Sequence, residues 1–232
     1  MEGNWRKELL FVLRQQVELY RTYQEKIHDR DLELQQHLEW FGSKVEQPIG
    51  PKPQGKKCGR NTPRFDLGTE LYRITGIDWA QVNGMDVVTA QTVLAECGAD
   101  LSAFPSEKQF TSWLGLVPTN EQSSGKILNR HTRKVVNRAA TAFRNAATTL
   151  IRSQSYLGAQ YRRLRTRLGA PKAITATARK LACLFYRLIK HGQQYVDKGM
   201  EYYEQRHREQ QIRSLRKRAQ KLGFQLVMPK TA

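Results

Sequence analysis

The sequence predicts an all-α protein whose basic residues gather in the second half of the chain. Apolar residues recur every three or four positions through several segments, and no segment shows the alternation typical of a β-strand. Glycines and prolines stand at the edges of these segments, where helices begin and end. We therefore expect a long N-terminal helix of coiled-coil character, a basic linker, a compact helical domain and a basic C-terminal helix.

The expected boundaries place the long helix at residues 1–42, the linker at 43–63, the helical domain at 64–192 and the basic helix at 193–232. In the first part, apolar residues fall at spacings of three, four or seven: Leu9, Leu13, Val17, Tyr20, Ile27, Leu34, Leu38 and Phe41. This stripe favours a helix that pairs with another helix, and packing on its own domain is the alternative. Gly, Pro and Lys at residues 50–57 are typical of a flexible linker.

A glycine turn precedes a periodic segment at the start of the helical domain. Residues 82–85 (Val-Asn-Gly-Met) lead into an expected helix at residues 87–97, and Gly98 ends it. The pattern is like half of a helix-hairpin-helix, in which the turn lets backbone N–H groups approach a phosphate. An ordinary turn before a helix is the alternative.

Further helices follow from capping and periodicity. Ser106 and Gln109 have the spacing of a capping box and open a short helix that Gly115 ends. After a polar loop at residues 118–130, we expect helices at residues 132–152, 155–168, 171–190 and 198–222. The first of these is expected to bury one apolar face: Val135, Val136, Ala139, Ala142, Phe143, Ala146 and Leu150.

The charge distribution predicts an anionic partner. The formal net charge is +18 and the pI is about 10.1. From Glu121 onward the chain holds 25 of the 39 Lys and Arg residues but only 5 of the 21 Asp and Glu residues. Nucleic acid fits this asymmetry best.

Membrane and secretory roles fit the sequence less well. The basic helices carry alanine-rich faces, and there is no apolar run of about 18 residues that could span a bilayer. The N-terminus lacks the apolar core of a signal peptide. Cys58, Cys97 and Cys183 are far apart, which is typical of reduced thiols and not of a disulfide framework or a zinc site. We expect a cytoplasmic protein with no membrane partner.

Chemistry becomes possible in the polar loop, where Ser123 and Ser124 precede Gly125. A serine nucleophile needs stabilisation of its alkoxide, and an attacked phosphodiester gains negative charge, so nearby cations serve both needs. The candidate cations are Lys126, Arg130, Arg133, Lys134 and Arg138. His131 is a candidate for proton transfer. An ordinary Ser-Ser-Gly turn with a solvated histidine is the alternative.

Two further groups of basic residues are candidates for nucleic-acid contact. Arg162 and Arg163 follow Tyr161, and an aromatic residue among arginines suits nucleic acid. Arg216 and Lys217 lie in the last helix, which could follow a phosphate backbone. In both helices a solvated charged face is the alternative.

Several motifs give the chain a resemblance to a known family. They are Phe-Asp-Leu at residues 65–67, Leu-Tyr-Arg-Ile at 71–74, Thr-Ala-Gln-Thr at 89–92, Leu-Gly-Leu-Val-Pro at 114–118, Asn-Arg-Ala-Ala at 137–140 and Leu-Gly-Ala-Pro-Lys-Ala-Ile-Thr-Ala-Thr-Ala at 168–178. The chain resembles the transposase domain of the bridge-RNA-guided insertion-sequence recombinases, the family numbered one-hundred-and-ten, and most closely its eleven-eleven subgroup. The resemblance covers residues 5–189.

The resemblance implies a serine nucleophile in the polar loop. Ser123 stands five residues after Pro118, where the family has its serine, and Ser124 stands where a glycine is usual. Because Ser124 directly precedes Gly125, it is the alternative nucleophile. The serine of the family attacks a DNA phosphodiester and becomes joined to the cut strand. The implied function is therefore cutting and rejoining DNA during transposition.

The sequence also departs from the family. Its members begin with an RNase H-like domain whose carboxylates bind divalent metal, and this sequence starts at the helical segment that follows that domain. We therefore expect no metal site or cofactor in this chain, with Mg²⁺ needed only by the missing domain, and a truncated or split product that is inactive alone. The alternative function is a non-catalytic fragment that binds nucleic acid or full-length transposase without cleavage.

The resemblance implies several partners. They are DNA at the element ends and at the target, a structured guide RNA, and a second copy or full-length transposase bound through the N-terminal helix. A helical scaffold that binds no nucleic acid is a third interpretation of the chain.

Overall fold

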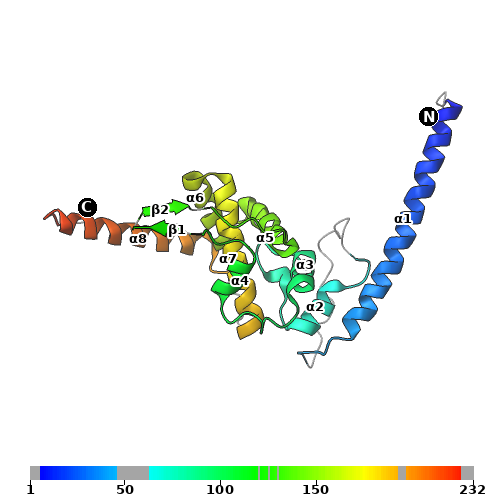
Figure 1. Ribbon diagram of the computed structural model, residues 1–232, viewed down its shortest axis with the longest axis horizontal. Coiled ribbons are helices and arrows are strands. Elements are labelled where there is room, and N and C mark those ends of the chain that lie inside the picture. The colour runs from blue at the N-terminus through cyan, green and yellow to red at the C-terminus, as the bar shows by residue number, and fades with distance from the viewer. Residues whose placement is uncertain are drawn as a thin grey trace. The chain divides into compact units, whose positions relative to one another are not determined.

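The computed structural model describes residues 6–45, 63–119, 121–124, 126–129, 131–192 and 197–225, and for residues 121–122 and 126–129 it describes the backbone alone. The predicted all-α class is confirmed (Figure 1). The elements are α1 (Lys7–Glu39), α2 (Leu67–Thr75), η1 (Trp79–Gln81), α3 (Val87–Cys97), α4 (Glu107–Trp113), β1 (Glu121–Ser123), β2 (Lys126–Asn129), α5 (Arg138–Thr149), η2 (Leu150–Arg152), α6 (Tyr156–Leu168), α7 (Ala170–His191) and α8 (Gly199–Lys221).

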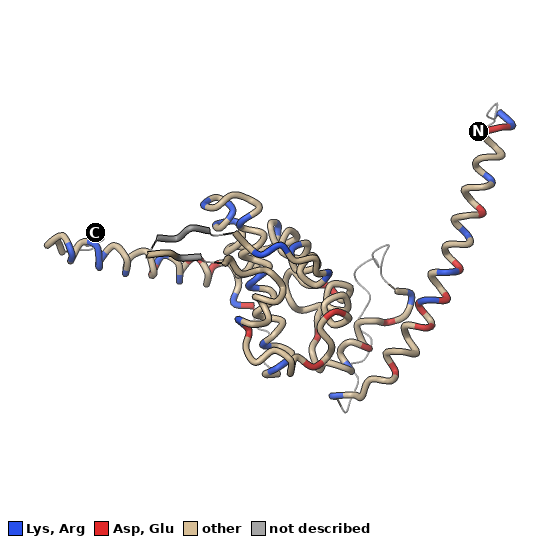
Figure 2. The backbone as a smooth tube through the Cα atoms, in the orientation of Figure 1, with Lys and Arg blue, Asp and Glu red and all other residues tan. Residues whose placement is uncertain are grey.

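The contacts divide the chain into two compact units, Met1–Gly76 and Ile77–Ala232. The four-part division predicted from the sequence stays a prediction, and most of its linker, residues 46–62, lies outside the described residues. Figure 2 shows basic residues along α8 and in the segment before α5, whereas α1 carries both signs of charge.

In the first unit, the guanidinium of Arg73 ties the end of α1 to α2. It donates to the carbonyl oxygens of Leu38 and Phe41, both at 2.7 Å, and pairs with Glu70 at 2.9 Å. Bonds to carbonyls at a helix end satisfy acceptors that the helix itself leaves open. The predicted long N-terminal helix is thus present and anchored at its C-terminal end.

The second unit has an aromatic core centred on Phe185 of α7. The ring centroid of Phe185 lies 5.0 Å from Trp79, 5.8 Å from Phe143 and 6.3 Å from Phe110. Alanines that are fully buried let the neighbouring helices approach α7 closely: Ala139, Ala140, Ala147, Ala173, Ala178 and Ala182. In Figure 1, α7 lies among α4, α5 and α6, and it contacts all three.

Polar contacts lock α4 and the turn before it to α7. Arg187 pairs with Glu107 at 2.7 Å, and Tyr186 donates its hydroxyl to the carbonyl oxygen of Phe104 at 2.8 Å. Lys190 donates to the same carbonyl at 2.7 Å. These contacts fix the element from which the polar loop departs.

Asp197 anchors the start of α8. Its carboxylate accepts from the backbone N–H groups of Tyr156 and Gly199, at 3.1 and 3.2 Å, and from the side-chain amide of Asn83 at 3.0 Å. The backbone N–H of Met200 donates to the carbonyl of Gln154 at 3.1 Å. No described residue of α8 is buried, so the helix is held mainly at its N-terminal end.

Several helix ends lie where the sequence predicts them. Ser106 and Ser155 cap α4 and α6, and their hydroxyls accept from the N–H groups of Gln109 and Gly158. Gly98 and Gly169 follow the last residues of α3 and α6 with φ angles of 79°. Local capping chemistry therefore determines these boundaries.

The helix expected at residues 132–152 begins later, at Arg138. Asn137 caps it by accepting from the N–H of Ala140 at 3.0 Å, and a capping residue stands outside the helix it opens. Val135 and Val136 consequently lie in extended chain, and Val136 is fully exposed. The prediction that Val136 faces the core is therefore wrong, whereas Val135 is half-buried beside Gly115 although it lies outside the helix.

The polar loop forms a short antiparallel hairpin of β1 and β2. Periodicity does not predict this hairpin, because strands of three and four residues are too short to show alternation.

The glycine turn before α3 is present, with φ of 83° at Gly84. A phosphate at the N-terminus of α3 would compete with the carboxylate of Asp86, which already accepts from the N–H of Thr89 at 2.7 Å.

Gly158 offers a test of the packing in the second unit. A Cβ at this position would overlap the carbonyl oxygen of Ser153 and lie 3.0 Å from that of Leu150. We expect Gly158→Ala to lower the free energy of unfolding by about 1–3 kcal/mol, measured by urea denaturation. Gly42→Ala is the matched control, because nothing lies within 4 Å of that position; equal stability of the two variants would contradict the packing.

The pair Glu107–Arg187 predicts a dependence of stability on pH. The hydrogen bond from Arg187 lowers the pKa of Glu107, so the folded pKa lies below the unfolded one. The stabilisation is complete above the unfolded pKa and is lost as the pH falls through the folded pKa. At neutral pH the free energy of unfolding of the wild type should exceed that of Glu107→Gln by about 0.2–1 kcal/mol. This difference should vanish in acid. A difference that urea denaturation finds equal at both pH values would contradict this.

Candidate functional site

The hairpin is the outer part of a longer two-stranded projection, here called the serine arm, which comprises residues 118–132. Ser123 pairs with Lys126, Gln122 with Ile127, and Pro118 forms a bridge with Thr132. The N–H and the hydroxyl of Thr119 both donate to the carbonyl oxygen of His131, at 3.0 and 2.8 Å. The arm thus keeps paired backbone at its base and at its tip.

The tip of the arm presents both candidate serines. Pairing of Ser123 with Lys126 leaves Ser124 in a two-residue turn, and its φ angle is 48°. Two-residue hairpin turns require this left-handed conformation, which favours glycine. Ser123 by contrast is the last residue of β1, and both serines are exposed.

Gly115 sets the base of the arm against the body. Its φ angle is 64°, and a Cβ there would lie 2.9 Å from a methyl group of Val135 and 3.0 Å from the carbonyl oxygen of Arg133. Leu114 and Leu116 on either side are buried. Only glycine lets the chain returning from the arm pass this close to the end of α4.

The candidate cations are spread along the arm. The pair at Pro118 lies at the base of the arm, and the pair at Ser123, five positions further along the chain, lies at its tip. Arg133 and Lys134 follow the base and are exposed, as is His131. Lys126 is opposite Ser123 in the backbone pairing, whereas its side chain and Arg130 lie outside the described residues.

A groove of about 620 Å³ runs between α3 and the start of α5, beside the chain that leaves the arm. Hydroxyl, amide, guanidinium and methyl groups line it: Thr89, Thr92, Val136, Asn137, Arg138 and Asn145. The side chain of Arg138 is 82% exposed and lies 3.5 Å from Glu96. The sequence does not predict this groove, because apolar periodicity places Val136 in a helix, whereas the residue lies before α5 and lines the groove.

The remaining candidate cations differ in availability. The guanidinium of Arg162 donates to the carbonyl oxygens of Ile151 and Ser153, at 3.1 and 2.6 Å, so it holds η2 to α6. Arg163 is half-buried in α6, and Arg216 and Lys217 are exposed on α8. The structure does not bring these residues together with the serine arm into one cluster.

Other chemistries find little support among the described residues. They contain no cluster of three His, Cys, Asp or Glu side chains that could hold a metal ion. Burial raises the pKa of the Cys97 thiol to about 12 and also raises the pKa of Cys183, so both thiols are protonated at neutral pH. Of the described helices, none is long and apolar enough to cross a membrane.

Comparison with known proteins finds a family match that includes this site. Residues 80–162 match the model of the transposase IS116/IS110/IS902 family. No curated protein and no solved structure matches the chain. The matched residues run from η1 into α6 and include the whole serine arm and the groove beside α5. The match supports a transposase function for this part of the chain.

Proposed function

We propose that the chain is a transposase-type DNA recombinase, or part of one, in which Ser123 is the nucleophile. The observation that carries this proposal is the position of Ser123: it ends a strand at the exposed tip of an arm inside the segment that matches the transposase family. An exposed hydroxyl on a projecting arm can reach a phosphodiester in a bulky duplex, which a hydroxyl in a closed pocket could not.

The proposed step conserves the phosphodiester linkage. The Oγ of Ser123 forms a bond to phosphorus, the bond from phosphorus to one sugar oxygen breaks, and the sugar leaves with a hydroxyl group. The serine proton passes through a base or water to the departing sugar oxygen, which completes the hydroxyl of the leaving group. Because one ester replaces another, the reverse attack by a sugar hydroxyl rejoins DNA and frees the serine.

The backbone favours Ser123 over Ser124 as the nucleophile. Ser124 occupies the left-handed turn position, which costs a residue other than glycine about 1 kcal/mol. A position of this kind explains why glycine would be usual there. Ser123 lies in extended strand and carries no such constraint.

The exposed cations at the base of the arm and in the groove supply the proposed contacts to DNA. Arg133, Lys134 and Arg138 follow one another along the chain that leaves the arm. They would hold phosphates at and beyond the base of the arm, away from Ser123 at its tip, and a duplex extending from the attacked bond would bridge this separation. Arg162 is not part of this set, because backbone carbonyls already occupy its guanidinium.

We further propose that α1 associates with a second copy of this chain or with a longer transposase. Five apolar residues of its predicted stripe, Leu9, Leu13, Val17, Tyr20 and Ile27, are between 40% and 63% exposed. A structured guide RNA is a further proposed partner, and a cytoplasmic location is proposed because Cys97 and Cys183 are thiols.

The described residues do not fit a divalent metal, since they provide no cluster of suitable ligands. No step of the proposed chemistry is therefore assigned to a metal ion in this chain. The separation between the serine and the cations at the arm base also favours a second candidate function, in which the chain binds nucleic acid without cutting it.

Substitution of the two serines distinguishes these functions. Wild-type protein is incubated with labelled element-end DNA, guide RNA and Mg²⁺, and covalent adducts are resolved on a denaturing gel. We expect Ser123→Ala to abolish the adduct while DNA binding is retained, and Ser124→Gly to keep the adduct because glycine suits the left-handed turn.

The other outcomes decide against parts of the proposal. An adduct that persists in Ser123→Ala and disappears in Ser124→Ala would make Ser124 the nucleophile. Binding by wild type with no adduct at all would favour the non-catalytic function. Loss of DNA binding in Ser123→Ala would show that the serine acts in recognition.

A further inference from the structure

We propose that a groove along α6, α7 and α8, here called the tyrosine groove, binds single-stranded nucleic acid. It consists of Tyr156, Lys180, Lys198, Tyr202, Arg206 and Arg213. Two adjoining hollows form it, of about 300 and 370 Å³, and both are lined by Tyr202 and Arg206. Volumes of this size are typical of ligand pockets.

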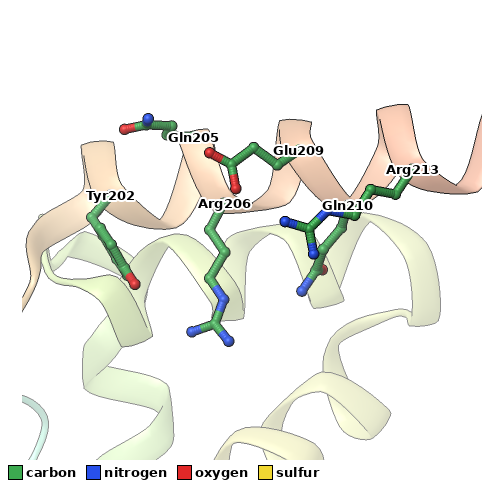
Figure 3. Close-up of a pocket in the computed structure, with 6 residues that line it drawn as sticks. All are labelled: Tyr202, Gln205, Arg206, Glu209, Gln210 and Arg213. Carbon is green, nitrogen blue, oxygen red and sulfur yellow. The ribbon is translucent and has the colours of Figure 1, made fainter.

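The side chains of Tyr202 and Arg206 extend from the same side of α8, as Figure 3 shows. They are four residues apart, one turn of the helix, and Arg213 continues the row two turns further on. The arrangement places an aromatic ring next to a file of guanidinium groups, which matches the alternation of base and phosphate in a strand.

Tyr202 is more exposed than the tyrosine that packs α8 most closely. That tyrosine is its neighbour Tyr203, whose ring meets Tyr156 edge to face at 4.9 Å and is half-buried. Tyr202 lies 6.3 Å from Tyr156 and remains 37% exposed, and the ammonium of Lys198 lies 4.8 Å from its ring centre. An aromatic ring left accessible beside cations is a platform for a base.

The charge in the tyrosine groove favours an anion. Lys180, Lys198, Arg206 and Arg213 are exposed, against two carboxylates, Asp197 and Glu209. Three uncharged N–H groups donate to Asp197 and orient its carboxylate, which keeps its charge, so four cations stand against two carboxylates. The surface left to a ligand is therefore positive, and Arg206 lies in both hollows.

The aromatic platform selects unpaired over paired strands. In a duplex each base is stacked between its neighbours, so a protein ring can stack only on a base that is unpaired or at an end. Single-stranded RNA and single-stranded DNA share this chemistry. The tyrosine groove is separate from the serine arm, and the inference rests on the proposed function only in that both involve nucleic acid.

Fluorescence anisotropy of the full chain tests this proposal. The probes are fluorescent single strands of about 12 nucleotides, one of oligouridine and one of oligothymidine, and a DNA duplex of the same length. We expect Tyr202→Ala to weaken binding of at least one single strand about tenfold, with little change for the duplex. Tyr202→Phe, which keeps the ring, should bind as wild type does.

Charge variants separate the groove from a general electrostatic effect. Arg206→Ala should weaken single-strand binding and reduce the salt dependence by about one phosphate contact. Arg208→Ala is the matched control, because it removes the same charge from α8 at an exposed residue outside the groove lining. It should have a smaller effect that is equal for single strands and duplex.

The outcomes are distinct from those of the serine experiment. Loss confined to oligouridine assigns the groove to RNA, and equal loss on both single strands assigns it to any unpaired strand. Unchanged single-strand binding by Tyr202→Ala, or an equal loss on the duplex, overturns the proposal. Because the binding assay needs no cleavage, its result does not depend on the identity of the nucleophile, so failure of one proposal leaves the other testable.

Discussion

The second unit depends on the packing of Phe185, which holds three aromatic rings from other elements around α7. Burial of a phenylalanine side chain stabilises a fold by roughly 1.5–3 kcal/mol, and aromatic pairs add to this. The alanines of α5 and α7 matter because they let the helices approach until the rings touch. The result is a packed helical body from which the serine arm extends.

Two conformational constraints shape the serine arm, one at its base and one at its tip. Gly115 lets the two ends of the arm cross close to the end of α4, and the left-handed Ser124 closes its tip. Between these two points, backbone pairs within the arm and the hydrogen bond from the Thr119 hydroxyl to the His131 carbonyl hold the arm together. A reactive group at such a tip meets its substrate outside the protein, which suits attack on DNA better than on a small molecule.

Much of the helical architecture follows from local sequence, because the caps at Ser106 and Ser155 and the glycines after α3 and α6 act within a few residues. The error at Val135 and Val136 arises because Asn137 caps α5 and leaves both residues outside the helix. Val135 then passes against Gly115, a nonlocal contact that no periodicity reveals. The pairing of β1 with β2 could not be predicted either, because strands this short show no alternation of apolar and polar residues. At the site, the serines were identifiable from their loop and from the family motifs, whereas the groove beside α5 required the observed start of that helix.

The positive charge of the chain has two physical uses that composition cannot separate. Arg73, Arg162 and Arg187 donate to carbonyl or carboxylate oxygens within the fold, so their charge stabilises helix ends and contacts between elements. Arg133, Lys134, Arg206 and Arg213 remain exposed and can exchange counterions for phosphates. The net charge of +18 therefore overstates the number of positive side chains that are available to bind nucleic acid. The meaningful quantity is the set of exposed cations that lie beside a serine, a groove or an accessible ring, since only there does charge act together with chemistry.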